Sequence, residues 1–173
     1  MSVVVEALDG PRYVAALDGL AELLVDAVDH GAGVNFMAGV TVAEARSWWE
    51  ARIDGVESGM VVPIVALDGE RIVGSTVLLY AWNPNSPHRG EISKVLVHSS
   101  ARRMGLGRML MEAAEARSRA DGRWLLVLDT VTGSDADAFY RSLGWHEVGT
   151  VPDFALMPDG TLTPTTYFWK DVR

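Results

Sequence analysis

A short run of basic and small residues, Arg102-Arg103-Met104-Gly105-Leu106-Gly107, has the composition of a turn that binds phosphate. The apolar residues 94–97 before it predict a strand, and residues 108–120 after it predict a helix. Backbone N–H groups at such a turn lack partners within the helix, and the helix N-terminus adds partial positive charge. Glycine lets an anion approach the backbone closely, and the two arginines add formal charge. The run therefore predicts a phosphate site, with a strand-to-helix turn that simply requires glycines as the alternative.

The spacing excludes two other phosphate-binding patterns. The sequence has no Gly-x-x-x-x-Gly-Lys-Ser/Thr, which excludes a nucleoside triphosphate P-loop. The glycines are not spaced as Gly-x-Gly-x-x-Gly, and no acidic residue closes a neighbouring strand at the distance typical of dinucleotide folds. What remains is Arg-x-x-Gly-x-Gly between a strand and a helix.

Strands and helices alternate around this turn in an order that predicts one mixed α/β domain over residues 1–173. Strands are predicted at residues 3–8, 61–67, 71–80, 91–97, 124–130, 145–151 and 167–170. Helices are predicted at residues 11–29, 41–57, 108–120 and 134–143. Thr41 and Glu44 form a capping box, and Asp68-Gly69 favours a hairpin turn.

The absence of cysteine removes several kinds of chemistry. The 173 residues, of which 49% are hydrophobic and 22% charged, suit one globular domain. Without cysteine there is no disulfide, no thiolate metal ligand and no cysteine nucleophile. The four histidines have no metal-ligand spacing, so we expect no metal site.

The net charge of −8 bears on the partners of the protein. Binding to a phosphate backbone requires the opposite sign, so we expect no nucleic acid partner. An acidic surface favours a cationic substrate such as an amine, although many proteins are simply acidic. No apolar run reaches ~18 residues, and residues 1–6 lack the basic start of a secretory signal. We therefore expect no membrane span and a cytoplasmic location.

Two patterns in the second half of the chain together resemble the GNAT acetyltransferase superfamily. They are the phosphate turn and the stretch Asp129-Thr130, Ala136, Phe139-Tyr140 and Gly144-Trp145. The resemblance implies an α/β fold with a mixed, mostly antiparallel central sheet of about seven strands flanked by four helices. It also implies acetyl-CoA as cosubstrate and direct transfer of its acetyl group to a primary amine. Many members have asparagine where this sequence has Gly133, so that contact to the cosubstrate is lost or supplied otherwise.

A closer resemblance, to the tabtoxin-resistance group of this superfamily, extends over most of the chain. It rests on residues 31–38, 100–102, 128–130, 138–140, 158–160 and 164–165. That group acetylates a toxin amine, so the resemblance implies a small-molecule acceptor such as an antibiotic or a toxin. A protein or peptide amine and a non-catalytic acetyl-CoA sensor are the alternatives. The oligomeric state does not follow from the sequence.

The family uses the strand before the turn to pair with the pantetheine arm, and the turn itself to bind the pyrophosphate. The resemblance therefore implies that Val95, Leu96 and Val97 bind the arm. The implied pyrophosphate site consists of Arg102, Arg103, Met104, Gly105, Leu106, Gly107 and Arg108. Ser99 or Arg102 is expected to reach the remaining phosphate.

Acetyl transfer to an amine requires a neutral amine, a stabilised oxyanion and a proton for the departing thiolate. Tyr140 lies where the family places its acid, and a phenol with a pKa of about 10 stays neutral at pH 7. The alternative is a core tyrosine, although the adjacent Phe139 is expected to be the better core residue. Backbone N–H groups are expected to bind the oxyanion.

Glu91 and Asp129 are the candidate general bases. Glu91 begins the strand that leads to the phosphate turn, and Asp129 follows the apolar run 124–128. Acids at such positions lie at the sheet edge, where α/β sites open. A solvated Glu91 and an Asp129 that caps the turn at Thr130 are the alternatives, and the sequence does not decide which acid is the base.

Asn35, Phe36 and Met37 lie between the two N-terminal helices, where GNAT proteins vary for substrate. The resemblance implies that they contact the acceptor, and Gly31 and Gly33 indicate a tight or mobile loop. Packing of Phe36 and Met37 between the helices is the alternative.

Overall fold

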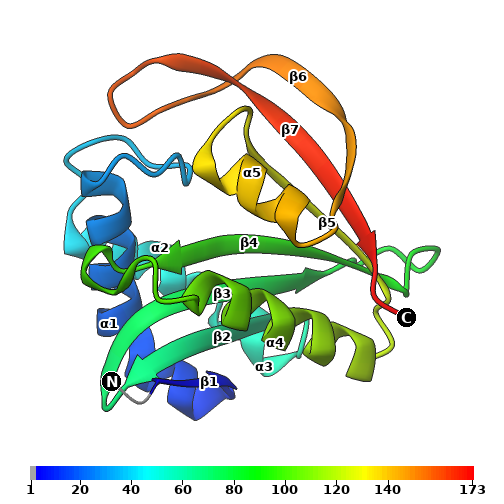
Figure 1. Ribbon diagram of the computed structural model, residues 1–173. Helices are drawn as coiled ribbons and strands as arrows, with labels where there is room; N and C mark the ends of the chain where they lie inside the picture. Colours follow the sequence, from blue (N-terminus) through cyan, green and yellow to red (C-terminus); the bar gives the residue numbers. More distant parts are fainter. Residues whose placement is uncertain (1–2) are drawn as a thin grey trace.

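A seven-stranded sheet in the order β1-β2-β3-β4-β5-β7-β6 forms the centre of the protein (Figure 1). The computed structural model describes residues 3–173, so Met1 and Ser2 of the predicted domain lie outside the described residues. The strands are β1 (Val3–Ala7), β2 (Val61–Asp68), β3 (Arg71–Tyr80), β4 (Arg89–Val97), β5 (Leu125–Val131), β6 (His146–Leu156) and β7 (Leu162–Asp171). Only β4 and β5 pair in parallel, which confirms the predicted mixed, mostly antiparallel sheet.

Helices cover both faces of the sheet (Figure 1). They are α1 (Gly10–Asp29), α2 (Val42–Glu50), α3 (Ile53–Glu57), α4 (Leu106–Ala120) and α5 (Asp135–Ser142), with a 3-10 turn at Ser99–Ala101. Side-chain packing places α1, α2 and α3 on one face and α4 and α5 on the other. Side-chain oxygens of Asp9, Thr41 and Ser134 cap α1, α2 and α5. Within residues 3–173, no helix is both long and apolar enough to cross a membrane.

The helix predicted over residues 41–57 is divided into α2 and α3. The backbone N–H of Arg52 donates to the carbonyl of Trp49, and the Arg52 guanidinium donates to the carbonyl of Trp48. A side chain thus takes the carbonyl that the N–H of residue 52 would bond in a continuous helix, and the helix ends. With α2 and α3 counted as one interrupted unit, the four predicted flanking helices are present.

The hydrophobic core has two parts, one on each face of the sheet. On the side of α4 and α5, Leu110, Leu126 and Phe168 are fully buried. On the side of α1, the largest buried side chain is Trp49, whose Nε1 donates to the carbonyl of Leu20 at 3.1 Å. Burial of each such side chain contributes about 1.5–3 kcal/mol. The sheet between these two parts is therefore a firm support for any site on its central strands.

Strand β4 separates from β5 near the middle of the sheet. The parallel pairing covers only residues 89–91 of β4, opposite residues 125–127 of β5. Beyond residue 91, none of the strands within residues 3–173 pairs with the β5 side of β4. The backbone groups of residues 95–97 on that side are therefore available to a ligand.

A β-bulge occurs in β4 just after the two strands part. Ser93 pairs with Val77 and Leu96 pairs with Ser75, so β4 has one more residue than β3 over this interval. Lys94 lies in the bulge and has a positive φ of +52°. Because side chains alternate along a strand, one extra residue changes the face on which the following side chains lie.

Strands β6 and β7 form a long hairpin that rises over α5 toward the loop between α1 and α2 (Figure 1). The backbone N–H of Ala38 in that loop donates to the carbonyl of Pro158 at the hairpin tip, at 3.0 Å. The sequence predicts shorter strands, at residues 145–151 and 167–170, separated by a loop that contains residues 158–160, whereas β6 continues through Pro152. An edge strand with a register shift accommodates proline, so the hairpin extends farther than predicted.

Candidate active site

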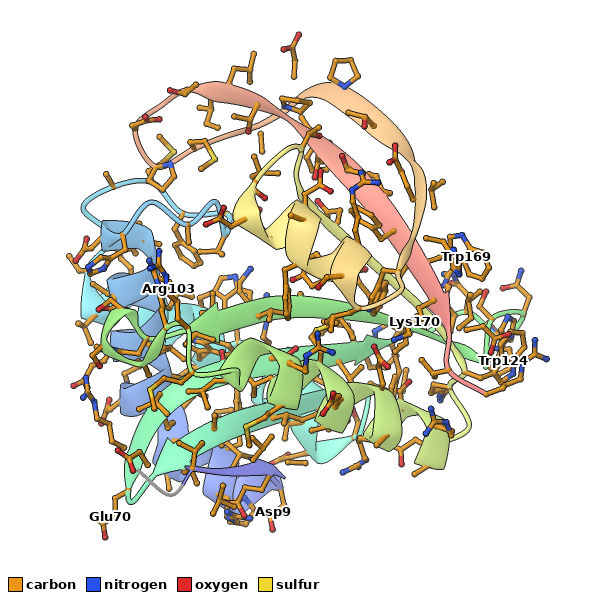
Figure 2. All side chains as sticks on the ribbon, in the orientation of Figure 1. Asp9, Glu70, Arg103, Trp124, Trp169 and Lys170 are labelled. Carbon is orange, nitrogen blue, oxygen red and sulfur yellow. The ribbon has the colours of Figure 1, made fainter. Side chains whose placement is uncertain are left out.

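A cavity of about 610 Å³ opens between β4, the start of α4 and α5, and we call it the cofactor cavity. Most of the residues predicted to bind acetyl-CoA line it: Val95, Leu96, Val97, Arg102, Arg103, Gly105, Leu106, Gly107 and Arg108. Met104 does not line the cavity, and its side chain is exposed. Figure 2 shows Arg103 at the turn before α4, at the opposite end of the molecule from Trp124 and Trp169.

The phosphate turn has a backbone geometry that suits an anion. Arg103 and Gly105 both have positive φ values, +63° and +80°. No side chain caps α4, which begins at Leu106, so the N–H groups of its first turn are available. Gly107 has a further reason to be glycine, because a Cβ there would lie 3.3 Å from the ring of Phe139. Glycine therefore lets α4 and α5 approach closely beside the cofactor cavity.

The 3-10 turn that precedes the phosphate turn is held to α1 by Ser99. Its backbone N–H and its hydroxyl both donate to the Asp26 carboxylate, each at 2.7 Å. Burial alone would raise the pKa of Asp26, but these hydrogen bonds outweigh burial and lower the pKa. Since Ser99 is already engaged, Arg102, which lines the cofactor cavity, is the remaining candidate for the last phosphate.

A second cavity of about 370 Å³ adjoins the cofactor cavity, and we call it the acceptor cavity. Both cavities are lined by Gly31, Ala32, Val95, Asp135, Ala136 and Tyr140. Apart from Tyr140, the acceptor cavity is built from segments within residues 31–35, 91–95, 129–136, 154–157 and 163–165. It therefore exists only when the 31–35 loop, two central strands and the C-terminal hairpin come together.

Tyr140 lies where the two cavities join. Only 7% of it is exposed, and its ring packs against Trp145 and Phe168, whose centroids are each 6.3 Å away. Burial raises the pKa of Tyr140, and the charge of Asp129 raises it further, so the hydroxyl stays protonated at neutral pH. The expectation that Phe139 is the better core residue is wrong, because Phe139 lies toward α4 at the cavity wall and is less buried.

The two candidate bases both line the acceptor cavity but differ in their surroundings. Asp129 accepts a hydrogen bond from the hydroxyl of Thr165 at 2.8 Å, which orients its carboxylate. Glu91 is an exposed residue at the cavity wall, and its pKa is raised, first by partial loss of hydration there and then by the negative charge of Asp129. A raised pKa makes a carboxylate a better proton acceptor near neutral pH, so the surroundings favour Glu91 as the base.

The loop between α1 and α2 contributes one of its three predicted contact residues to the acceptor cavity. Asn35 lines the cavity and has a positive φ of +70°. Phe36 packs edge-on against Trp48, with ring centroids 6.1 Å apart, and Met37 is exposed. Neither Phe36 nor Met37 lines either cavity, so helix packing accounts for Phe36.

Gly133, which stands where many GNAT sequences have asparagine, has a local structural role. It has a positive φ of +72°, and its N–H donates to the Asp137 carboxylate at 2.8 Å. Gly133 lines neither cavity and shapes the turn that leads into α5.

The sequence prediction missed several residues of the acceptor cavity. Lys94 lines it although only 8% of this charged residue is exposed. The sequence carries no local signal for it, because the same strand also contains the polar residues Glu91 and Ser93. Phe154, Met157 and Pro164 from the β6–β7 hairpin also line the cavity. They lie beyond the ends of the strands that the sequence predicts, so the sequence does not place them at the site.

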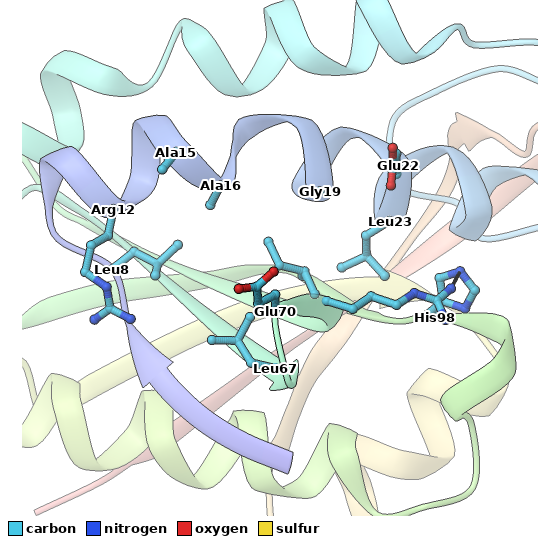
Figure 3. A pocket seen from close by; sticks show the side chains of 12 residues that line it. Leu8, Arg12, Ala15, Ala16, Gly19, Glu22, Leu23, Leu67, Glu70 and His98 are labelled. Carbon is cyan, nitrogen blue, oxygen red and sulfur yellow. Dashed lines mark hydrogen bonds between the residues drawn. The ribbon is translucent and has the colours of Figure 1, made fainter. Parts of the chain in front are cut away.

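A third cavity, of about 390 Å³, lies between α1 and the β2–β3 hairpin (Figure 3). Figure 3 shows Arg12, Glu70 and His98 along it, and none of the residues predicted to do chemistry. Tyr140 is not among the residues that line this cavity. In the part of the chain that the structure describes, no group of three His, Asp or Glu side chains is arranged to hold a metal ion.

Comparisons with known proteins agree with this geometry. A family model described as "Acetyltransferase (GNAT) family" matches residues 22–145. A relative from Pseudomonas paraeruginosa (strain DSM 24068 / PA7), named L-methionine sulfoximine/L-methionine sulfone acetyltransferase, is 30% identical over 145 residues, 80% of each chain. A relative of the same name from Pseudomonas aeruginosa is also 30% identical over 145 residues, again 80% of each chain.

Solved structures resemble the fold over almost its whole length. An N-acetyltransferase from Staphylococcus aureus Mu50 superposes with a TM-score of 0.80 at 16% identity, covering 100% of both chains. YncA from Salmonella typhimurium, a putative acetyltransferase solved with its cofactor acetyl-CoA, superposes with a TM-score of 0.78 at 20% identity. That match covers 100% of this chain and 95% of the other.

Proposed function

The chain belongs to the GNAT acetyltransferase family and is an acetyl-CoA-dependent N-acetyltransferase, and we propose that its acceptor is the primary amine of a small amino acid. The observation that carries this proposal is the meeting of two cavities at Tyr140. One cavity has the phosphate turn on its wall, and the other has two carboxylates. A cosubstrate and an amine bound in the two cavities would meet beside the tyrosine hydroxyl, as direct transfer in a ternary complex requires.

Three features support a small acceptor over a protein amine. The acceptor cavity is the smaller of the two, at about 370 Å³. The hydrogen bond between Ala38 and Pro158 joins the α1–α2 loop to the hairpin tip, so the two segments that border the acceptor cavity contact each other. The two Pseudomonas relatives are named for methionine sulfoximine and methionine sulfone, which are free amino acids with a primary amine.

The acceptor cavity has walls of two kinds. Glu91 and Asp129 supply negative charge for an ammonium group. Val131, Phe154 and Met157 supply apolar surface for a side chain of moderate length. An amino acid with an uncharged side chain matches both walls. The proposal includes resistance to an antibiotic or toxin that is itself such an amino acid.

The proposed reaction begins with deprotonation of the acceptor. Glu91 takes one proton from the ammonium, and the neutral nitrogen attacks the thioester carbon to form the C–N bond. Collapse of the tetrahedral intermediate breaks the C–S bond. Tyr140 gives its proton to the departing sulfur and regains one from the nitrogen, which leaves an amide, a thiol and a protonated Glu91.

The oxyanion requires donors that are fixed before the reaction. The edge of β4 near Val95 and Leu96 is unpaired on its β5 side, and both residues line the cofactor cavity. Backbone N–H groups from this edge are the proposed oxyanion donors. The same edge would pair with the pantetheine arm as an added strand does.

Release of free thiol from acetyl-CoA by the purified protein tests the proposal. The acceptor panel contains methionine sulfoximine, methionine sulfone, an aminoglycoside, a streptothricin, a polyamine and peptides. We expect turnover of the two amino acids and none of the peptides. Turnover of peptides alone would support a protein-amine transferase, and tight acetyl-CoA binding without any turnover would support a sensor. The cytoplasmic location stays a prediction, and the oligomeric state is open.

A further inference from the structure

The chain has two lysines, Lys94 and Lys170, whose ammonium groups have different surroundings. Lys170, labelled in Figure 2, donates to both carboxylate oxygens of Glu115 at 2.8 Å and to the carbonyl of Leu143 at 2.9 Å. Lys94 is only 8% exposed, yet no acceptor within residues 3–173 lies at hydrogen-bond or ion-pair distance from its ammonium. A buried charge without a partner is costly, so its position requires an explanation.

The backbone of β4 places the Lys94 side chain on the face of the sheet that α1 and α2 cover. The β-bulge adds one residue between Ser93 and Leu96, and Lys94 takes a positive φ that β-strand residues avoid. Without the extra residue, Lys94 would share the face of Ile92, which belongs to the core on the α4 side. With it, Lys94 lies on the side of α1 and α2, where its ammonium contacts the Trp48 ring, and it lines the acceptor cavity beside Glu91 and Ile92.

Aromatic packing holds the Lys94 ammonium in place without neutralising it. Its Nζ lies 4.6 Å from the ring centroid of Trp48, and the Arg52 guanidinium stacks on the same indole at 3.1 Å. Burial and, to a smaller extent, the charge of Arg52 lower the pKa of Lys94 to about 8, against the opposing effect of the Asp129 and Glu91 carboxylates. At neutral pH the group is therefore still mostly charged, and a negative ligand would stabilise that form.

The ammonium of Lys94 is not fully enclosed in protein. Among residues 3–173, the one fully enclosed side-chain polar atom without a partner is Nε1 of Trp145. Lys94 Nζ also lacks a partner but is not enclosed, and the acceptor cavity is the space that Lys94 lines. The residues that line the cavity thus include two acids, Glu91 and Asp129, and one lysine whose ammonium has no partner, a set of charges that complements a zwitterion.

We propose that Lys94 binds the carboxylate of an α-amino-acid acceptor while Glu91 and Asp129 face its ammonium, and that Lys94 thereby selects amino acids over simple amines. This inference rests on the proposed function, because it names the part of the acceptor that the cavity recognises. It assigns Lys94 to binding and specificity. A general base at this position would instead act on every acceptor alike.

Three acceptors separate these roles: L-methionine sulfone, its α-carboxamide, and 3-(methylsulfonyl)propan-1-amine, which lacks the carboxylate. Lys94→Met is expected to raise the KM of methionine sulfone roughly 10- to 100-fold, as expected for loss of a hydrogen bond between charged groups. The same variant should change kcat/KM for the carboxamide and the amine by less than about threefold, with the KM of acetyl-CoA unchanged. Lys94→Arg should retain part of the preference for the carboxylate.

Arg52→Met is the matched control, since it removes a cation from the same indole but does not line the acceptor cavity. It should not change the preference for the carboxylate. An equal loss on all three acceptors in Lys94→Met, or no loss on any, in a variant that melts as a folded protein, would overturn the inference alone. A wild-type protein that binds acetyl-CoA but acetylates none of the three would contradict the proposed function as well.

Discussion

The two cavities of this protein are built in opposite ways. One continuous stretch of chain, residues 95–108, supplies nine of the predicted cosubstrate contacts in the cofactor cavity. The acceptor cavity draws its walls from widely separated segments, from residue 31 to residue 165. A strand, a glycine turn and a helix N-terminus form a local unit whose binding groups are mostly backbone N–H groups. The acceptor cavity depends instead on side chains whose positions are set by the tertiary fold.

Binding of the cosubstrate is the property that the enzyme shares with its family, and choice of the acceptor is the property specific to it. A cosubstrate that never changes is bound by backbone geometry, which requires little more than glycine at certain positions. The proposed acceptor would be bound by side chains, several of them on a loop and a hairpin, where residues can change without disturbing the core. Mutations in the two cavities should therefore produce different kinetic signatures.

Tyr140→Phe should have the largest effect, because Tyr140 belongs to both cavities. Loss of the proton donor is expected to lower kcat about 10²- to 10⁴-fold for every acceptor, with the affinity for acetyl-CoA unchanged. Tyr80→Phe is the matched control, because Tyr80 is equally buried and its hydroxyl donates to Asp121 at 2.8 Å, away from both cavities. Steady-state kinetics and calorimetric titration with acetyl-CoA measure both quantities. A Tyr140→Phe enzyme with normal kcat would refute the assignment of Tyr140 as the acid.

The next largest effect is expected on the cofactor side, from Gly105→Ala. Gly105 and Gly122 lie at opposite ends of α4 with positive φ values of +80° and +73°, and a Cβ at either position would meet no neighbouring group within 4 Å. Alanine should therefore destabilise the fold by a similar amount at either site, about 1–2 kcal/mol. Only Gly105→Ala should also weaken acetyl-CoA binding, by roughly tenfold or less, because its methyl group lies at the phosphate turn.

Thermal melts and acetyl-CoA titrations of the two glycine variants separate strain from binding. Gly105→Ala should lose affinity to the same extent whichever acceptor is used, since the turn does not contact the acceptor. If both variants lost affinity equally, the turn would have no special part in binding and the effect would come from helix strain alone.

The same contrast explains what could be predicted from the sequence. The phosphate turn, the order of strands and helices along the chain and the capping box of Thr41 and Glu44 follow from local patterns, so their positions are predicted to within a few residues. Lys94 was missed because a β-bulge shifts the alternation of β4, and no local pattern signals that shift. The length of the C-terminal hairpin was underestimated because residues 152–156 and 162–166 have no regular strand pattern, although a strand at the sheet edge tolerates Pro152. Phe36 was placed near the acceptor, whereas it packs on Trp48.

Lys94→Met should show that the acceptor cavity is maintained at the expense of stability. Burial lowers the pKa of Lys94 from 10.5 to about 8, with Arg52, Glu91 and Asp129 as its charged neighbours. Below pH 8 the folded and unfolded states are both protonated, so the cost of burying the charge is complete. Between pH 8 and 10.5 the folded state releases its proton first, and this cost disappears.

Methionine at position 94 should therefore raise the melting temperature by a few degrees at pH 7. The gain should shrink as the pH rises from 8 toward 10.5. Melting curves of both proteins across this range provide the test. A gain that stays constant with pH would mean that methionine stabilises by packing alone and that the buried charge carries no penalty.

The smallest effect is expected at the rim of the acceptor cavity, from Phe154→Ala. Phe154 lines the cavity and packs edge-on against Tyr167 at 5.9 Å, yet it is 45% exposed, so its truncation removes only part of one apolar wall. We expect a rise of a few-fold in the KM of amino acids with long side chains, and less for short ones, because a methylene group contributes about 1 kcal/mol in such a pocket. Val148→Ala, on the same strand but 69% exposed and outside both cavities, should change neither. Competition between methionine sulfone and a shorter amino acid measures the ratio directly. An unchanged ratio would show that the hairpin only covers the acceptor, and that selectivity comes entirely from the charged groups on β4 and β5.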